Sequence, residues 1–329
     1  MTRTQLIKAL TSPDTINLYS EADRVRKEYM GDAVHLRGLI EFSNVCGRDC
    51  LYCGIRRSNK DVFRYKMPVD EIVKTAENAK KLGYKSLVLQ SGENCQYPLK
   101  EMCNFISRIK KELGVAITLS IGEKTKEEYA ALKEAGCDRY LLRFETSARD
   151  IFHQLRPASS FEDRIRCLKW LRELGFQVGS GIMVGLPGQT AAMIAEDILL
   201  MNELDLDMIG IGPFIADGHT PLKDAQNGSL ELTLKTLALI RITTKNTHLP
   251  ATTAMGSIDS QGRQKALKCG ANVLMPNVTP TKYRKHYQLY PNKICINDKP
   301  GDCSLCISGM VISLGRTIAT DAGHTLKHR

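Results

Sequence analysis

The chain reads Phe42-Ser-Asn-Val-Cys-Gly-Arg-Asp-Cys-Leu-Tyr-Cys-Gly54 directly after its first apolar run. Three cysteines of this stretch, Cys46, Cys50 and Cys53, follow the spacing Cys-x3-Cys-x2-Cys, and the same loop holds no fourth. A structural zinc site takes four protein ligands, whereas a cubane iron–sulfur cluster held by three thiolates keeps one iron open for a ligand. The spacing therefore indicates a catalytic centre rather than a structural one.

The overall composition is that of an ordinary globular protein. The 329 residues are 43% hydrophobic and 25% charged, which suits one α/β barrel or two average domains. No apolar run is long enough for a membrane helix, and the segment Met1-Thr-Arg-Thr-Gln-Leu-Ile-Lys8 is too polar for a signal peptide. We therefore expect a cytoplasmic location and no contact with a membrane.

The charge and the cysteine content narrow the classes of partner. The formal net charge of +10 suits an anionic partner, but the basic residues are spread along the sequence, which favours a well-solvated surface and no nucleic-acid partner.

Disulfides do not persist in the cytosol, so the eleven cysteines are predicted to be metal ligands or buried thiols. Five cysteines outside the two clusters are expected to be small core residues: Cys95, Cys103, Cys137, Cys167 and Cys269.

Eight short runs rich in Val, Ile, Leu and Thr alternate with amphipathic segments along the chain. Nearly continuous apolar runs are typical of parallel strands that are covered on both faces. The strands are predicted at Gly38–Ser43, Ser86–Ser91, Ala116–Ile121, Arg139–Phe144, Gln177–Val184, Met208–Ile215, Pro250–Met255 and Asn272–Pro276.

The segments between these strands carry helix signals, such as the capping box Thr125-Lys-Glu-Glu128. Strand–helix units repeated eight times predict an α/β fold, a complete (β/α)8 TIM barrel, with an open doubly wound sheet as the alternative. The predicted domains are a helical extension over residues 1–35, the barrel over 36–290, and a C-terminal segment over 291–329 packed on the barrel.

Active sites of such barrels lie at the C-terminal ends of the strands, where the cysteine loop is expected to lie. The second strand ends in Gln90-Ser91-Gly92-Glu93, a small turn whose backbone and carboxylate suit an ammonium group, although taken alone a generic turn is the better explanation. The fourth strand ends with Arg143 and Glu145, which point to the same side because strand side chains alternate with period two. Such charges form either ligand contacts or a buried ion pair.

The cysteine spacing, with Tyr52 before the last cysteine, resembles the motif of the radical S-adenosylmethionine (SAM) superfamily. In that superfamily three thiolates bind a [4Fe-4S] cluster whose free iron is chelated by SAM, and one-electron reduction yields a 5′-deoxyadenosyl radical. By this resemblance Gln90, Ser91, Gly92 and Glu93 stand where the superfamily binds the amino group of SAM. The stretch Gly181-Ile-Met-Val-Gly-Leu-Pro-Gly188 is similar to its motif beside the adenosine.

Within this superfamily the chain is similar to the biotin-synthase-like group, and most of all to the HydE family of [FeFe]-hydrogenase maturases. The similarity covers essentially the whole chain and is carried by Glu41–Arg57, Arg143-Phe-Glu-Thr146 and Tyr287-Gln-Leu-Tyr-Pro291. It implies SAM contacts from Tyr52, Ser120, Glu145 and Arg164, with Met208 against the adenine. It also implies an internal substrate cavity lined by Arg143, Thr252, Thr253, Tyr287 and Tyr290.

A second cysteine cluster lies near the C-terminus, where Cys295, Cys303 and Cys306 follow the spacing Cys-x7-Cys-x2-Cys among turn-forming residues. Three cysteines in so short a stretch predict a second metal site. The family resemblance implies an auxiliary [2Fe-2S] or [4Fe-4S] cluster on the surface, which is not general in that family and not required for its activity.

The resemblance implies a maturase that helps to assemble the diiron subcluster of [FeFe] hydrogenase. Its substrate would be a cysteine-bound iron carbonyl cyanide complex from the maturase HydG, attacked at sulfur by the adenosyl radical, with HydF as the downstream scaffold. A ferredoxin- or flavodoxin-like protein would supply the electron.

The alternative functions are a mutase like methylornithine synthase, against which the second triad argues, and a non-catalytic iron–sulfur carrier. Biotin synthase is disfavoured, because only Cys95 lies near the strand ends where that enzyme holds a second cluster.

Overall fold

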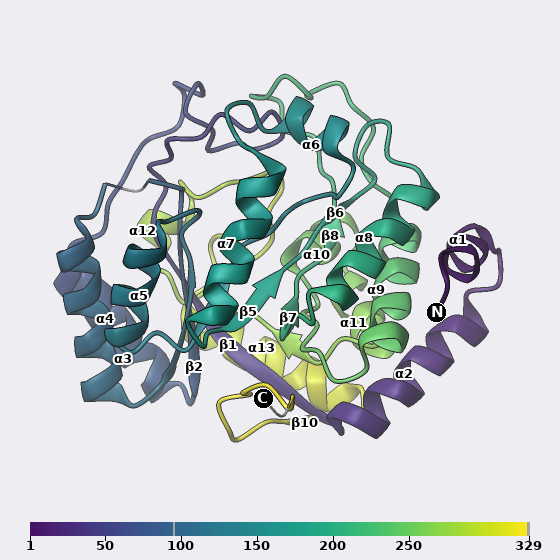
Figure 1. The fold of residues 1–329 in the computed structure, drawn as a ribbon. Helices are drawn as coiled ribbons and strands as arrows, with labels where there is room; N and C mark the ends of the chain where they lie inside the picture. The colour runs from purple at the N-terminus through teal and green to yellow at the C-terminus, as the bar shows by residue number, and fades with distance from the viewer. Residues whose placement is uncertain (95, 328–329) are drawn as a thin grey trace.

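A curled parallel sheet forms the centre of the molecule and is surrounded by helices (Figure 1). The computed structural model describes residues 1–94 and 96–327. Neighbouring strands pair in the order in which they occur in the chain: β1 (Ala33–Ser43), β2 (Ser86–Ser91), β3 (Ala116–Ser120), β4 (Arg139–Leu141), β5 (Gln177–Ser180) and β7 (Met208–Ile209). Consecutive parallel neighbours with a helix between them are the arrangement expected of a barrel.

The ring closes through short contacts rather than through full strands. Met208 of β7 forms a parallel bridge with His248, and Pro250 forms one with Val273 of β9 (Val273–Leu274). Strand β9 in turn pairs with β1 through His35 and Leu36. Eight parallel positions therefore surround the axis, which confirms the predicted (β/α)8 barrel.

The seventh predicted strand, Pro250–Met255, is wrong over most of its length. Only single bridges occur at His248 and Pro250, and the helix α10 (Thr253–Ile258) begins where the strand was expected to continue. Thr252 and Thr253 thus lie at the start of this helix and not on a strand. A short apolar run does not by itself distinguish a strand from a helix, which is why periodicity gave the wrong element.

Two further predicted strands are interrupted where they approach each other most closely. A Cβ atom on Gly181 would lie 1.8 Å from the carbonyl oxygen of Gly210, so the backbones touch at this point. Beyond it the two chains pair again as β6 (Met183–Val184) and β8 (Gly212–Pro213). This small second sheet forms part of the rim above the barrel.

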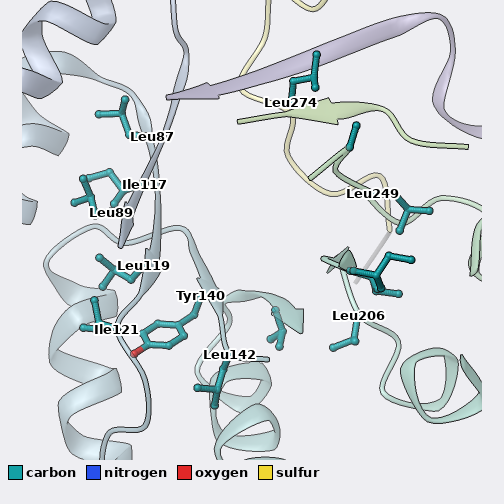
Figure 2. Close-up of a cluster of buried hydrophobic side chains, with 14 of the residues drawn as sticks. Leu87, Leu89, Ile117, Leu119, Ile121, Tyr140, Leu142, Leu206, Leu249 and Leu274 are labelled. Carbon is teal, nitrogen blue, oxygen red and sulfur yellow. The ribbon is translucent and has the colours of Figure 1, made fainter. Parts of the chain in front are cut away.

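The helices cover the outer faces of the strands and enclose the core. Figure 2 shows part of it, where Leu87, Leu119 and Tyr140 belong to one cluster of buried side chains and are each at most 1% exposed. The capping box at Thr125 is present as predicted. The helices are α3 (Val69–Lys81), α4 (Leu99–Leu113), α5 (Lys126–Glu134), α6 (Arg149–Leu155), α7 (Phe161–Glu173), α8 (Ala191–Glu203), α9 (Leu230–Thr244), α10, α11 (Gly262–Lys268) and α12 (Thr281–Arg284).

Four of the five scattered cysteines belong to or pack on this core, as predicted. The thiols of Cys137, Cys167 and Cys269 are buried, and Cys103 packs against the core from a half-buried position. Cys95 lies outside the described residues.

Both ends of the chain add elements to the barrel. Helices α1 (Arg3–Thr11) and α2 (Ile16–Met30) pack along the side formed by α8 and α9 (Figure 1). At the other end, α13 (Pro300–Ser313) leads to β10 (Thr317–Ile318), which pairs with the first residues of β1. The predicted domain boundaries stay predictions. Within the described residues, no helix has both the length and the apolar character needed to cross a membrane.

The last described residues lie under the barrel, an arrangement for which the sequence offered no signal. Arg139 Nη2 donates hydrogen bonds to the carbonyl oxygens of Ala322 and Gly323, at 2.7 and 2.9 Å, and the ring nitrogen Nε2 of His248 lies 3.1 Å from the carbonyl oxygen of His324. The chain thereby covers the strand ends opposite the cysteine loop (Figure 1).

Candidate active site

A cavity of about 350 Å³ lies inside the barrel and extends from the cysteine loop down to Arg37 on β1. The structure brings together in its wall every residue predicted for the first cluster, for SAM and for the substrate. These residues are Cys46, Cys50, Tyr52, Cys53, Gln90, Ser91, Gly92, Glu93, Ser120, Arg143, Glu145, Arg164, Met208, Thr252, Thr253, Tyr287 and Tyr290.

Backbone hydrogen bonds hold the cysteine loop against its surroundings. Gly47 N donates to Glu93 O at 2.7 Å, and Gly92 N donates to Ser43 O at 3.0 Å, so the loop and the end of β2 are joined twice. On the other side, Leu51 N donates to Leu155 O of α6 at 2.9 Å. The three thiols therefore have positions fixed by backbone contacts rather than by each other.

The residues of this loop fit an iron–sulfur cluster. Cys46, Cys50 and Cys53 are free thiols in the wall of one cavity, and thiolates are the ligands that hold such clusters. Burial raises the pKa of Cys46 and, together with the neighbouring thiols, that of Cys53. Among the described residues no three acidic, histidine or cysteine side chains surround a single metal position. A cubane takes one thiolate per iron, so its ligands need not converge on one point.

Glu93 lies at the centre of a network of arginines. Arg48 Nε donates to Glu93 Oε1 at 2.5 Å, while Arg156 Nη2 and Arg164 Nη2 each lie 3.5 Å from Glu93 Oε2. Glu123 joins the network through Arg48 at 2.6 Å and Arg164 at 2.9 Å. Burial alone would raise the pKa of Glu93, but the three guanidinium charges outweigh it and hold the pKa below its ordinary value. The mouth of the cavity thus presents an ionised carboxylate.

Arg156 was not predicted as a site residue. It follows α6, and its Nη1 donates to the hydroxyl oxygen of Tyr52 at 2.7 Å. Its Nε is buried without a hydrogen-bond partner, and the side chain lines the cavity. The guanidinium of Arg156 thereby connects Tyr52 to Glu93, and its Nε–H is available to donate a hydrogen bond to a ligand.

We predict that Arg156→Gln and Tyr52→Phe are strongly coupled. Each removes the same hydrogen bond, so the double variant should bind SAM little worse than Arg156→Gln alone, with a coupling free energy of about 1–2 kcal/mol. SAM titration and the KM for SAM measure this in a double-mutant cycle, with Arg156→Lys as the conservative control. Strictly additive losses would show that the contact contributes nothing.

Arg143 and Glu145 form an ion pair, with Arg143 Nη2 3.0 Å from Glu145 Oε2. This is the alternative that the sequence left open beside ligand contacts, although both side chains also line the cavity. Glu145 has a φ of +66°, so it leaves strand geometry, while Arg143 Nη2 donates to Ile182 O at 2.6 Å. Arg143 Nε and Thr252 Oγ1 are buried and have no hydrogen-bond partner. Both atoms remain available to a ligand.

A buried ion pair between Glu41 and Lys293 forms another part of the wall. Glu41 is 1% exposed and Lys293 is 9% exposed. Asn277 Nδ2 donates to Glu41 Oε2 at 2.8 Å, and Lys293 Nζ donates to Tyr287 O at 3.1 Å. The hydroxyl of Tyr287 accepts a hydrogen bond from Gln90 Nε2 at 3.2 Å. Glu41 and Lys293 join the site without having been predicted as members.

Met208 lies near the base of the cavity, because it is the first residue of β7. Its sulfur lies 2.7 Å from Arg37 Nη1, at the strand ends opposite the cysteine loop. Its contact with the adenine of SAM stays a prediction.

The glycine-rich loop after β6 is held from behind by Gln189 and Asp197. Gly185, with a φ of +85°, donates its N–H to Gln189 Oε1 at 2.7 Å. The carboxylate of Asp197, which is fully buried, accepts the N–H of Ser147 at 2.5 Å, and Gln189 Nε2 lies 3.5 Å from its Oδ2. Burial raises the pKa of Asp197 from 3.8 to about 7.

Asp197→Asn should therefore change how stability depends on pH. Between pH ~4 and ~7 the folded protein keeps a proton that the unfolded chain releases, so the free energy of unfolding falls as the pH rises. Between pH 5 and pH 8 this group should lower the free energy of unfolding of the wild type by an amount on the order of 3 kcal/mol. The neutral amide of Asp197→Asn should remove this decrease. Urea unfolding at pH 5 and pH 8 measures the difference. Equal pH profiles for the variant and the wild type would contradict this account.

The second cysteine triad lies outside the cavity, on α13 and the loop before it. Cys303 and Cys306 are three residues apart and share a helix face, with Cys303 buried and Cys306 exposed. A hydrogen bond with Cys295 lowers the pKa of Cys303 to about 7. Arg284 Nη1 fixes this loop by donating to Cys295 O and Asp298 O, each at 2.8 Å. The three free thiols range from buried Cys303 through half-buried Cys295 to exposed Cys306, and a metal site there would lie near the surface.

Residues 40–201 match the radical SAM superfamily. The [FeFe] hydrogenase maturase subunit HydE of Thermotoga maritima is 51% identical over 306 residues, which is 93% of this chain and 88% of that protein. The chain belongs to the HydE family of radical SAM enzymes. A 3-methylornithine synthase of Methanosarcina barkeri is 28% identical over 265 residues, or 80% of this chain and 75% of that protein.

Solved structures agree on the fold. Methylornithine synthase (PylB) superposes with a TM-score of 0.86 at 24% identity and covers 97% of this chain and 94% of its own. The maturase HydG of Carboxydothermus hydrogenoformans gives a TM-score of 0.80 at 20% identity over 96% of this chain and 75% of its own. At these identities the likeness shows the fold alone. Membership of the radical SAM superfamily implies a [4Fe-4S] cluster and SAM as cofactors.

Proposed function

We propose that this enzyme acts as a maturase in the assembly of the diiron subcluster of [FeFe] hydrogenase. The observation that carries the proposal is the 51% identity with the Thermotoga maritima HydE across 93% of the chain. That stretch includes the cysteine loop and the cavity wall. An identity of this size over nearly the whole chain extends well beyond the three-cysteine motif of the superfamily.

The cluster site and the SAM site divide the upper cavity between them. Cys46, Cys50 and Cys53 would hold the [4Fe-4S] cluster, and Glu93 and Arg164 would bind the amino-acid part of SAM. With both cofactors bound, one-electron reduction of the cluster would cleave SAM to methionine and a 5′-deoxyadenosyl radical. The barrel wall around the cavity would shield this reaction from water.

The proposed role of the remaining residues also follows the predictions. Ser120 and Glu145 would contact SAM from the third and fourth strands, beside Tyr52 and the Gln90-Ser91-Gly92 turn. The predicted contact of Met208 with the adenine would require the adenosine to extend toward the base of the cavity, where Met208 lies beside Arg37.

The lower cavity would bind the substrate, a cysteine-bound iron carbonyl cyanide complex supplied by HydG. The unpartnered donors Arg143 Nε and Thr252 Oγ1 suit the acceptor ligands of such an anionic complex. Thr253, Tyr287 and Tyr290 would complete the wall, and the radical would attack the sulfur of the complex. HydF would receive the product, and a ferredoxin- or flavodoxin-like protein would supply the electron.

The second triad, Cys295, Cys303 and Cys306, would hold an auxiliary [2Fe-2S] or [4Fe-4S] cluster. Its position outside the cavity is consistent with a role other than in the attack on the substrate. The proposed location of the enzyme is the cytoplasm.

A maturation assay tests this function. Purified, reconstituted enzyme with SAM, HydG, HydF and apo-hydrogenase should restore hydrogen evolution, and omission of this chain should abolish it. Methylornithine synthase is the second candidate, favoured by the 28% identity with the Methanosarcina barkeri enzyme over 80% of this chain. Incubation with lysine and SAM separates the two, because formation of methylornithine without any maturation would overturn the proposal. A non-catalytic carrier would support neither reaction.

A further inference from the structure

The loop between the cysteines and α3 wraps around the outside of the cluster site. Arg64 anchors it, since Nη1 donates to Asn44 O and Ile55 O, both at 2.8 Å. Asn44 lies two residues before Cys46 and Ile55 two residues after Cys53, so Arg64 ties the loop to both ends of the cysteine motif. Both cysteines are only half-buried. A protein bound to this loop would therefore lie beside the segment that carries the cluster ligands.

The outer face of this loop carries an exposed aromatic ring. Phe63 is 66% exposed, and its ring contacts the ring of His286, with 4.7 Å between the centroids. Asn44 Nδ2 binds both segments, donating to Phe63 O at 2.8 Å and His286 O at 2.7 Å. Phe63 is therefore held in place at the surface, and its exposure is built into the loop.

Exposed cations surround this ring without ion-pair partners among the described residues. They are Arg57 and Lys60 on the same loop and Lys285 beside His286. By contrast, Lys66 pairs with Glu101 and Lys282 pairs with Glu71 at the edge of this surface. The mouth patch, defined as Arg57, Lys60, Phe63 and Lys285, thus combines three free positive charges with one apolar ring. Asp61 is an exposed carboxylate on the same loop, next to Lys60.

We propose that the mouth patch is the docking surface of an acidic one-electron carrier protein that reduces the cluster. Carboxylates of the carrier would pair with the three cations, and the edge of its cofactor would face Phe63. The carrier loses one electron and the cluster gains it, with no bond made or broken. The proposal rests on the proposed function, which requires a reduced cluster. Complementary charge speeds the encounter and fixes its orientation.

The test compares two electron sources. The probe is an acidic flavodoxin in its hydroquinone form, and dithionite, which needs no docking, is the second source. In the triple variant Arg57→Glu/Lys60→Glu/Lys285→Glu, flavodoxin-driven formation of 5′-deoxyadenosine should fall about tenfold to a hundredfold. Formation driven by dithionite should stay unchanged. Phe63→Ala should weaken the flavodoxin-driven reaction alone.

A matched control separates docking from net charge. Lys81→Glu/Lys111→Glu/Lys268→Glu changes the charge equally, at exposed positions in the last turns of α3, α4 and α11, at the opposite end of the barrel. An equal loss in both triple variants would overturn the proposal. So would a loss caused instead by Leu305→Glu, which lies on the exposed apolar face of α13 beside the second triad.

Direct binding keeps the test independent of turnover. Flavodoxin binding, measured by titration calorimetry at low salt, should be lost in the mouth-patch variant and kept in the control. If dithionite yields no 5′-deoxyadenosine with the wild type, the proposed function fails, while the calorimetry still decides whether the patch docks the carrier. Undiminished binding to the mouth-patch variant would overturn the proposal.

Discussion

Gly92→Ala is expected to abolish SAM cleavage while leaving the barrel folded. A Cβ atom at this position would lie 2.3 Å from Val45 O and 2.8 Å from Cys46 Cβ, so the backbone of the cysteine loop would have to move. The hydrogen bond from Gly92 N to Ser43 O, at 3.0 Å, would be strained by the same shift. A displacement of this size at the cluster should lower activity about a hundredfold or more. Formation of 5′-deoxyadenosine and iron content measure the effect.

Gly309→Ala is the matched control for this substitution. Gly309 lies on α13, and a Cβ there would have no atom within 4 Å. Because alanine favours helix over glycine, the control should be neutral or slightly stabilising. Normal activity of Gly92→Ala would contradict the structure of the cysteine loop.

Lys293→Met is expected to destabilise the fold by about 3–5 kcal/mol, because it leaves the buried carboxylate of Glu41 without its cation. Glu41→Gln should cost a similar amount by stranding the ammonium. The double variant Glu41→Gln/Lys293→Met removes both charges and should be more stable than either single variant. The midpoint of urea unfolding, compared across the four proteins, gives the coupling.

A double variant more stable than either single variant would show that the Glu41–Lys293 ion pair stabilises the fold, although both side chains line the cavity. A double variant as unstable as the sum of its singles would show that the two charges do not stabilise each other. Recovery of stability without recovery of maturation would indicate in addition that the charge of Glu41 or Lys293 acts on the substrate, since both side chains line the cavity.

The sequence predicted the parts of the site that lie close together in the chain. Cys46 to Cys53 and Gln90 to Glu93 are consecutive stretches at strand ends, and the barrel rule places them at one mouth. Arg156 escaped prediction because its partner Tyr52 is 104 residues away and its own neighbours carry no motif. Lys293 escaped for the same reason, since 252 residues separate it from Glu41. Such contacts depend on the packing of the folded chain.

The fold was predicted where the repeat was regular and missed where the backbone departs from it. The clearest case is the pair of predicted strands Gln177–Val184 and Met208–Ile215. Each is continuous in the apolar pattern, but the close approach of the backbones at Gly181 and Gly210 interrupts both. The run Pro250–Met255 has the composition of a strand, yet its second half forms α10. The tail beneath the barrel is held by carbonyl oxygens of residues 322–324, and backbone acceptors leave no trace in a sequence.

The central claim is that this chain cleaves SAM reductively at the three-cysteine loop. The most direct measurement is the amount of 5′-deoxyadenosine formed by anaerobically reconstituted protein with SAM and dithionite, compared with Cys50→Ala treated in the same way. The wild type should form 5′-deoxyadenosine and Cys50→Ala none. No product from the wild type, or as much product from Cys50→Ala, would contradict the claim.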